Sequence, residues 1–356
     1  MTGEGRVPLT PEACRPLVAA GHAIFVQENA GINSGYSDEE YRQIGAQLVE
    51  TSQALYESSQ LIVKVKQPLA QDLVSLRSDH VLFCYLHLAA DPALVQALCD
   101  IGLSAIPFES VADETGHLPL LTPMSQVAGR IATIRGSSLL FRNRGGRGIL
   151  LGGIDGAEPG RVVVLGAGVA GTHALASAVA LGAKVDVLDL NEEKLQSLKQ
   201  RYPAIETHIS SAEAVERLCI EADLVIGAVL LPGRRAPVVL RKSVVQQMNE
   251  GSVIIDISID QGGCVEGIHA TSSEHLFYTE YGVIHTAVPN MPATVARTAS
   301  QSLSSAILPY VEKLAAVEID VLADSESYQQ RALHHAMAVH QGKIVDQVLQ
   351  QEMQKQ

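Results

Sequence analysis

Short apolar runs alternate along the chain with longer, amphipathic stretches. Val, Ile and Leu dominate the runs at 161–165, 184–188, 224–229 and 253–257. Runs of this length predict strands, and the stretches between them are long enough for helices. Strands that alternate with helices in this way predict a doubly wound parallel sheet.

Between Cys14 and Ala105 the same alternation recurs with shorter pieces, which predicts a separate α/β domain. Its predicted strands are 24–27, 61–65 and 81–86, and its predicted helices are 11–20, 38–44 and 92–99. Two longer helical patterns would lead from one domain to the other and back. They are 124–142, despite Gly129 and Gly136, and 293–315, with a kink expected at Pro309.

Length, charge and cysteine usage narrow the class of protein. A chain of 356 residues exceeds the size at which single cores stop growing, which predicts two domains. A net charge of −13 without a Lys/Arg block argues against nucleic-acid binding. The five widely spaced cysteines form no C-x-x-C pattern, so neither a disulfide framework nor a metal site is expected, and a reducing, cytoplasmic location follows. No signal peptide or membrane span is expected either.

A glycine motif follows the first strand of the predicted sheet. Gly166, Gly168 and Gly171 form a G-x-G-x-x-G pattern between the apolar run and the helix that begins near Thr172. Such glycines let the backbone approach a pyrophosphate and let helix and strand pack closely. Asp189 ends the next strand, where a carboxylate binds ribose hydroxyls and repels a 2′-phosphate. Strand, glycines, helix and acid together favour an NAD site over an ordinary tight turn.

Four other residues could bind substrate or carry out chemistry. His87 and Asp260 follow apolar runs, at the strand ends where α/β proteins bind ligands, and His87 could transfer protons near neutral pH. Lys66 and Arg6 could hold a carboxylate. Each residue also has a structural alternative. His87 could be a hydrogen-bonded buried histidine, Lys66 and Arg6 could be solvated surface cations, and Asp260 could cap a loop.

These residues lie in segments that resemble the alanine dehydrogenase family from about Glu4 to Ala315. Besides the glycine motif, the matching segments are Glu4–Val7, Lys64–Lys66, Leu86–Ala90, Leu120–Ser125, Gly227–Gly233, Ile259–Cys264 and Val288–Pro292. The resemblance implies a Rossmann NAD-binding domain, residues 123–297, inserted into a discontinuous α/β substrate domain, residues 1–122 plus 298–356. It also implies a homohexamer.

The family's chemistry is the reversible, NAD-dependent conversion of L-alanine to pyruvate and ammonium. By resemblance, Arg6 and Lys66 would bind the substrate, His87 would be the general acid/base, and Asp260 would assist water and ammonia chemistry. The resemblance also implies cofactor contacts from Ser125, Ser210, Val229, Ile257, Asn290 and Met291.

Two departures from the family pattern leave alternatives open. Family members usually carry a short strand before the Glu4–Arg6 segment, so we expect a sheet with one strand fewer and a loosely held Arg6. Pro289 stands where the family more often has a small residue, and it removes one backbone donor. The alternatives are the NAD-binding component of a proton-translocating transhydrogenase, which usually lacks an Asp at the position of Asp260, and a non-catalytic NAD-binding homologue.

Overall fold

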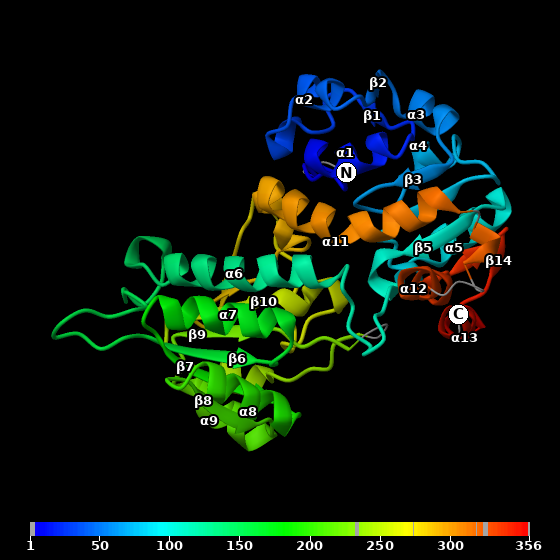
Figure 1. Cartoon of the computed structure of the whole chain (residues 1–356). Helices are drawn as coiled ribbons and strands as arrows, with labels where there is room; N and C mark the ends of the chain where they lie inside the picture. The colour runs from blue at the N-terminus through cyan, green and yellow to red at the C-terminus, as the bar shows by residue number, and fades with distance from the viewer. Residues whose placement is uncertain (1–3, 232–234, 273, 318, 323–326, 355–356) are drawn as a thin grey trace. The chain divides into compact units, whose positions relative to one another are not determined.

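The structure, a computed structural model, describes residues 4–231, 235–272, 274–317, 319–322 and 327–354. The chain divides into two compact units (Figure 1). The first unit joins Met1–Met124 to Ala293–Gln356, and the second unit is Ser125–Pro292. The predicted fold class is confirmed, because an α/β unit with a parallel sheet is inserted into a discontinuous α/β unit. The chain passes between the units near Met124 and Pro292, where the resemblance predicted boundaries at 122 and 298.

The second unit is built on a sheet in the order β11-β12-β10-β9-β6-β7-β8. All neighbours pair in parallel except β11, which is antiparallel to β12. The strands are β6 (Arg161–Leu165), β7 (Lys184–Asp189), β8 (Glu206–Ile209), β9 (Leu224–Gly227), β10 (Val253–Asp256), β11 (Tyr278–Glu280) and β12 (Val283–Thr286). The order runs outward from β6 in both directions, which makes the gap between β6 and β9 the point where ligands bind in doubly wound sheets.

Buried side chains explain why the central strands form. In β6, β9 and β10 every residue is buried except Arg161 at the start of β6, so helices cover both faces of the sheet. The helices are α7 (Val169–Ala180), α8 (Glu192–Arg201), α9 (Ala212–Ile220) and α10 (Lys242–Val245), with most of α6 (Thr122–Leu139). Side-chain caps fix two of their starts, since Asn191 accepts from Lys194 N and Ser211 from Ala214 N.

Helix α6 lies against α7 through a glycine (Figure 1). A Cβ atom on Gly129 would lie 2.1 Å from the carbonyl oxygen of Ala170, so only glycine allows this approach. Gly136, about two turns further along α6, makes room in the same way for the side chain of Leu224. The two glycines that weaken the helical pattern in the sequence are therefore packing positions.

The first unit contains a five-stranded sheet, in the order β14-β13-β5-β4-β3, and a separate parallel pair, β1 with β2. β3, β4 and β5 are parallel, whereas β13 and β14 are antiparallel additions from the C-terminal part of the chain. The strands are β1 (Phe25–Gln27), β2 (Gln47–Val49), β3 (Leu61–Val63), β4 (Val81–Cys84), β5 (Ser104–Pro107), β13 (Val339–His340) and β14 (Lys343–Ile344).

Helices from both ends of the chain complete the core of the first unit. α11 packs through Leu303 and Ile307 into a cluster that includes Phe83 of β4 and Ile106 of β5. The helices are α1 (Pro11–Ala19), α2 (Asp38–Gln43), α3 (Ser52–Ser58), α4 (Ala70–Leu73), α5 (Pro92–Ile101), α11 (Ala296–Ala316), α12 (Tyr328–Ala336) and α13 (Gln347–Gln354). In the parts of the chain that the structure describes, none of the helices is both long and apolar enough to cross a membrane.

Three details differ from the sequence-based expectations. The predicted strands 61–65 and 81–86 end earlier, at Val63 and Cys84, so Lys66 and His87 lie in the segments that follow the strands. The helix expected at 293–315 begins at Ala296 and continues past Pro309 as one helix. Very short strands such as β2, β11, β13 and β14 were not predicted, because two or three residues carry too little pattern.

We predict that Gly129→Ala destabilises the second unit by about 1–3 kcal/mol, the usual cost of overpacking, although alanine is the better helix former. The added methyl group must displace the Ala170 carbonyl. Urea unfolding followed by circular dichroism measures the change. Arg130→Ala, at the adjacent exposed position of the same helix, is the control and should change the free energy of unfolding little. Equal stability of the two variants would contradict the packing argument.

Candidate functional site

The turn from β6 to α7 lies at the point where the strand order of the second unit reverses. Gly166 N donates to Leu188 O of β7 at 2.8 Å, and Ala228 N, just after β9, donates to Leu165 O at 2.8 Å. The turn is thus held between the ends of the two strands that flank β6. The N-terminal N–H groups of α7 begin directly after it, as an anion site requires.

The three motif glycines have different surroundings. Gly166 has φ of +103°, and a Cβ there would lie 2.6 Å from Ala228 O. A Cβ on Gly171 would lie 1.8 Å from Gly166 O, so α7 packs directly on the turn. Around Gly168, by contrast, a Cβ would meet no described atom within 4 Å. Two glycines are therefore required by the fold, and the third leaves open backbone where a pyrophosphate could approach.

Asp189, the last residue of β7, is joined to this turn. Its Oδ2 accepts from Ala167 N at 2.6 Å, and its Oδ1 accepts from Asn191 N at 2.8 Å. The carboxylate therefore orients the glycine turn as well as standing at the strand end where ribose hydroxyls bind in Rossmann units.

Most of the other predicted cofactor residues also follow parallel strands of this sheet. Ser210 comes after β8, Val229 after β9, Ile257 after β10, and Asn290 with Met291 after β12. Carboxyl ends of parallel strands share one edge of a sheet, so the fold brings these positions to the edge that carries the glycine turn. Ser125 lies in α6 instead. Pro232 and Gly233 of the matching segment Gly227–Gly233 lie outside the described residues.

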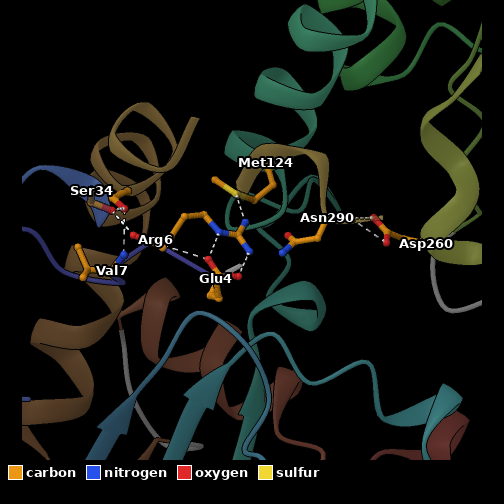
Figure 2. A network of polar contacts seen from close by, with 9 residues as sticks. Glu4, Arg6, Val7, Ser34, Met124, Asp260 and Asn290 are labelled. Carbon is orange, nitrogen blue, oxygen red and sulfur yellow. Dashed lines mark hydrogen bonds and ion pairs between the residues drawn. The ribbon is translucent and has the colours of Figure 1, made fainter. Parts of the chain in front are cut away.

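Asp260 lies in the 3-10 turn Ile257–Gln261 that follows β10. Its side chain is exposed, and both carboxylate oxygens accept from Asn290 N, at 3.2 and 3.3 Å (Figure 2). Asn290 has φ of +55°, a left-handed conformation that non-glycine residues rarely adopt. Two predicted site residues are thus in direct contact, with an unusual backbone conformation at one of them.

Arg6 is buried, 6% exposed, and its guanidinium is held on two sides. Glu4 accepts from Nε at 2.7 Å and from Nη2 at 2.6 Å, and Nη1 lies 3.1 Å from the Met124 sulfur (Figure 2). The expectation of a loosely held Arg6 is therefore wrong. Glu4 was quoted in the sequence only as part of the matching segment, and its charge partner is visible only in the fold.

Two serines of α11 fix the segment that follows Arg6. Ser300 Oγ accepts from Val7 N, and Ser304 Oγ accepts from Thr10 N, both at 2.9 Å. Ser304 also donates to Pro8 O at 2.8 Å. Since both serines are at most 2% exposed, these bonds form in a dry environment, where they position the backbone firmly.

Arg6 and Lys66 line a cavity of about 1030 Å³ within the first unit, together with Glu4 and Lys64. Residues 24–27 of the β1 region and 61–66 of the β3 region line it as well. Burial acts to lower the pKa of Lys64, but Tyr56 and Asp72 outweigh it and raise that pKa; Asp72 Oδ2 lies 2.5 Å from Lys64 Nζ. Lys64 is therefore committed to an internal ion pair.

His87 follows β4 in a left-handed conformation, with φ of +50°. Its backbone N–H and that of Leu86 donate to Glu109, at 2.5 and 3.2 Å, and its Nδ1 lies 3.7 Å from Glu109 Oε1. The His87 side chain is 46% exposed and stacks on Tyr85, 7° from parallel. Sequence reasoning missed Glu109, because no motif surrounds it.

Comparisons with known proteins identify the family. The model for the alanine dehydrogenase/PNT N-terminal domain matches residues 1–128, and that for the C-terminal domain matches residues 132–347. The chain belongs to the alanine dehydrogenase/PNT family. Together the two matches cover most of the chain, including every predicted site residue.

Curated relatives and solved structures agree with this assignment. The alanine dehydrogenase of Halomonas elongata is 42% identical over 96% of this chain and 91% of its own length, and that of Bacillus subtilis is 44% identical over 88% and 82%. A structure titled L-alanine dehydrogenase is 44% identical and matches with a TM-score of 0.94 over 99% of this chain and 97% of its own. A transhydrogenase from Sinorhizobium meliloti is 25% identical, with a TM-score of 0.81 over 98% and 97%.

We predict opposite effects of alanine at two motif glycines. Gly168→Ala should leave the melting temperature nearly unchanged, because its Cβ meets no described atom, but weaken NAD binding by about tenfold or more, which is about 1.4 kcal/mol. Gly171→Ala should lower the melting temperature without any cofactor present, because its Cβ would overlap Gly166 O. Calorimetry of unfolding and of NAD titration separates the two. A Gly168→Ala protein that binds NAD as the unchanged protein does would show that this turn is not the cofactor site.

Proposed function

We propose that this chain catalyses the reversible, NAD-dependent oxidative deamination of L-alanine to pyruvate and ammonium. The observation that carries the proposal is the 44% identity and TM-score of 0.94 to a structure titled L-alanine dehydrogenase, over 99% of this chain. The transhydrogenase alternative has less support, at 25% identity. Asp260, which that alternative usually lacks, is present here.

The substrate carboxylate would be bound by Arg6 and Lys66. Both line the cavity of the first unit, and the Glu4 ion pair holds the Arg6 fork in one orientation. Because Glu4 accepts from Nε and Nη2, the planar guanidinium would donate to the substrate carboxylate from its Nη1 and Nη2 edge, and an ammonium group adds charge without a fixed direction. The pair would therefore orient a small amino or keto acid.

His87 would move the protons of the reaction. With Nδ1 beside Glu109, we assign proton transfer to Nε2. It would take a proton as water adds to the imine carbon and return one as ammonia leaves the carbinolamine. The two backbone bonds to Glu109 would keep the imidazole on its turn during both steps.

The residues of the second unit fit a dinucleotide. Open backbone at Gly168 and the start of α7 suit a pyrophosphate, and Asp189 suits an adenosine ribose without a 2′-phosphate. Ser125, Ser210, Val229, Ile257, Asn290 and Met291 would make further contacts. When bound, NAD would accept the hydride that leaves the substrate α-carbon. The carboxylate of Asp260 would stabilise the cationic iminium that remains.

The proposal extends to the assembly and the location of the protein. A homohexamer rests on the resemblance alone. A cytoplasmic location rests on the five cysteines, which are all unpaired, as a reducing compartment would leave them.

Turnover with a panel of substrates tests the proposal. We expect NADH formation from L-alanine, slower rates with larger L-amino acids, and NADH consumption with pyruvate plus ammonium. NADP should be used at least about tenfold less efficiently, since Asp189 repels its 2′-phosphate. The NAD-binding component of a transhydrogenase would not oxidise an amino acid. NADH formation from L-alanine therefore distinguishes the proposed function from the transhydrogenase alternative. Absence of NADH formation with every amino acid would overturn the proposed function.

We predict that His87→Ala lowers kcat by about 10²-fold or more, the usual loss when a general acid/base is removed, and leaves NAD affinity unchanged. The reason is that His87 belongs to the first unit and the glycine turn to the second. Steady-state kinetics and NAD titration measure both. His117→Ala, which removes an exposed histidine of the same unit, is the control and should keep full turnover. A loss of NAD affinity of more than about tenfold would instead make His87 a structural residue.

A further inference from the structure

A second carboxylate, that of Asp256, lies four positions before Asp260. Asp256 is the last residue of β10 and is completely buried. Its Oδ1 accepts from Ser258 N at 2.8 Å, and its Oδ2 accepts from Cys264 N at 2.7 Å and Val265 N at 3.2 Å. One side chain thus binds both ends of the loop that contains Asp260.

We propose that Asp256 is a positioning residue that closes the loop Ile257–Val265 and thereby holds Asp260 in place. The part of this proposal that concerns catalysis rests on the proposed function. Within the described residues the Asp260 carboxylate is held through the Asn290 N–H (Figure 2), so the backbone of the loop must define its position.

The space around Asp256 is shaped for this contact. A Cβ on Gly227, at the end of the neighbouring β9, would lie 3.2 Å from Asp256 Oδ1 and 2.5 Å from Cys264 Sγ. A Cβ on Gly263 would lie 3.0 Å from Asp256 Oδ2, and Gly263 has φ of +79°. Glycine at both positions lets the carboxylate and the thiol of Cys264 fit between strand and loop.

The hydrogen bonds of the buried Asp256 carboxylate also agree with a role as a structural anchor. Burial raises the pKa of Asp256, and the N–H groups of Cys264, Ser258 and Val265 act in the opposite direction. An isolated buried carboxylate would be expensive, whereas one that accepts three backbone bonds rigidifies its neighbourhood. The far end of the loop is tied down again, because Cys264 O accepts from Val239 N at 2.8 Å and Leu240 N at 3.1 Å.

Asp256→Asn tests the anchor without reference to activity. An amide keeps the shape but presents N–H groups to backbone N–H groups, so the loop should open and expose Cys264. We expect iodoacetamide to label Cys264 at least about tenfold faster than in the unchanged protein. Mass spectrometry of the labelled peptides gives the rate, and Cys219, buried in α9, is the internal reference.

A matched variant controls for the loss of any buried carboxylate. Asp223 is buried just before the start of β9, so it lies at the opposite ends of the strands from Asp256. Its carboxylate accepts from Arg161 N at 2.8 Å and from Arg147. Asp223→Asn should lower stability and leave Cys264 as protected as before. If Asp256→Asn does not fold, Gly227→Ala loosens the same contact while keeping the carboxylate, and it should also expose Cys264. Protection of Cys264 that is unchanged in both variants would overturn the proposal.

A double-mutant cycle tests the consequence for catalysis. Asp260→Asn should lower kcat by about 10²-fold, and Asp256→Asn by about tenfold. If Asp256 acts through Asp260, the double variant should be no slower than Asp260→Asn by more than about twofold. Losses that multiply would show that Asp256 acts by another route. An unchanged protein without turnover would refute the proposed function, while the labelling of Cys264 would still decide the anchor.

Discussion

The fold of the second unit depends on backbone-to-backbone contacts around one turn. Gly166 and Gly171 lie so close to other main-chain atoms that a single Cβ at either would collide with a carbonyl oxygen. These contacts set the distance from β6 to α7 and from β6 to the end of β9. Because the helix starts where the strands end, its first N–H groups lie next to Gly168, where a Cβ would meet no described atom within 4 Å.

In the first unit, buried polar groups rather than glycine contacts fix the position of the candidate site residue Arg6. Ser300 and Ser304 of α11 bind the backbone of the Val7–Thr10 segment, which is far from them in sequence. The Glu4 carboxylate then fixes the direction of the Arg6 side chain. A cation that must bind a carboxylate in a defined orientation needs such support, because a long side chain in solvent would lose entropy on binding. The C-terminal part of the chain is therefore required to place a residue near its start.

The sequence predicted the parts of this arrangement that have a strong local cause. β6 agrees with its predicted bounds, and the glycine motif was interpreted correctly as a strand–turn–helix junction, because a fully apolar run and a backbone requirement both leave clear patterns. Glu109 and Asp256 were missed for the opposite reason. Their partners are backbone N–H groups, which every residue has, so nothing in the sequence distinguishes them from other acids. Arg6 was expected to be loose because the strand that usually precedes it in the family is missing, whereas the serines that hold its segment come from α11, far away in the sequence.

Asp256 at the end of β10 and Asp260 in the loop after it illustrate how environment divides roles between identical side chains. Asp256 is buried, and three short backbone bonds use its lone pairs, so it cannot reach a ligand. Asp260 is exposed and accepts from Asn290 N at 3.2 and 3.3 Å, which leaves its charge available. A carboxylate that stabilises a transient cation must keep that charge unneutralised and yet hold still. A flexible loop would meet the first condition and fail the second. A buried acid that anchors the loop keeps the loop still, and an exposed acid on the loop keeps its charge. The four-residue spacing of Asp256 and Asp260 lets one short turn meet both conditions.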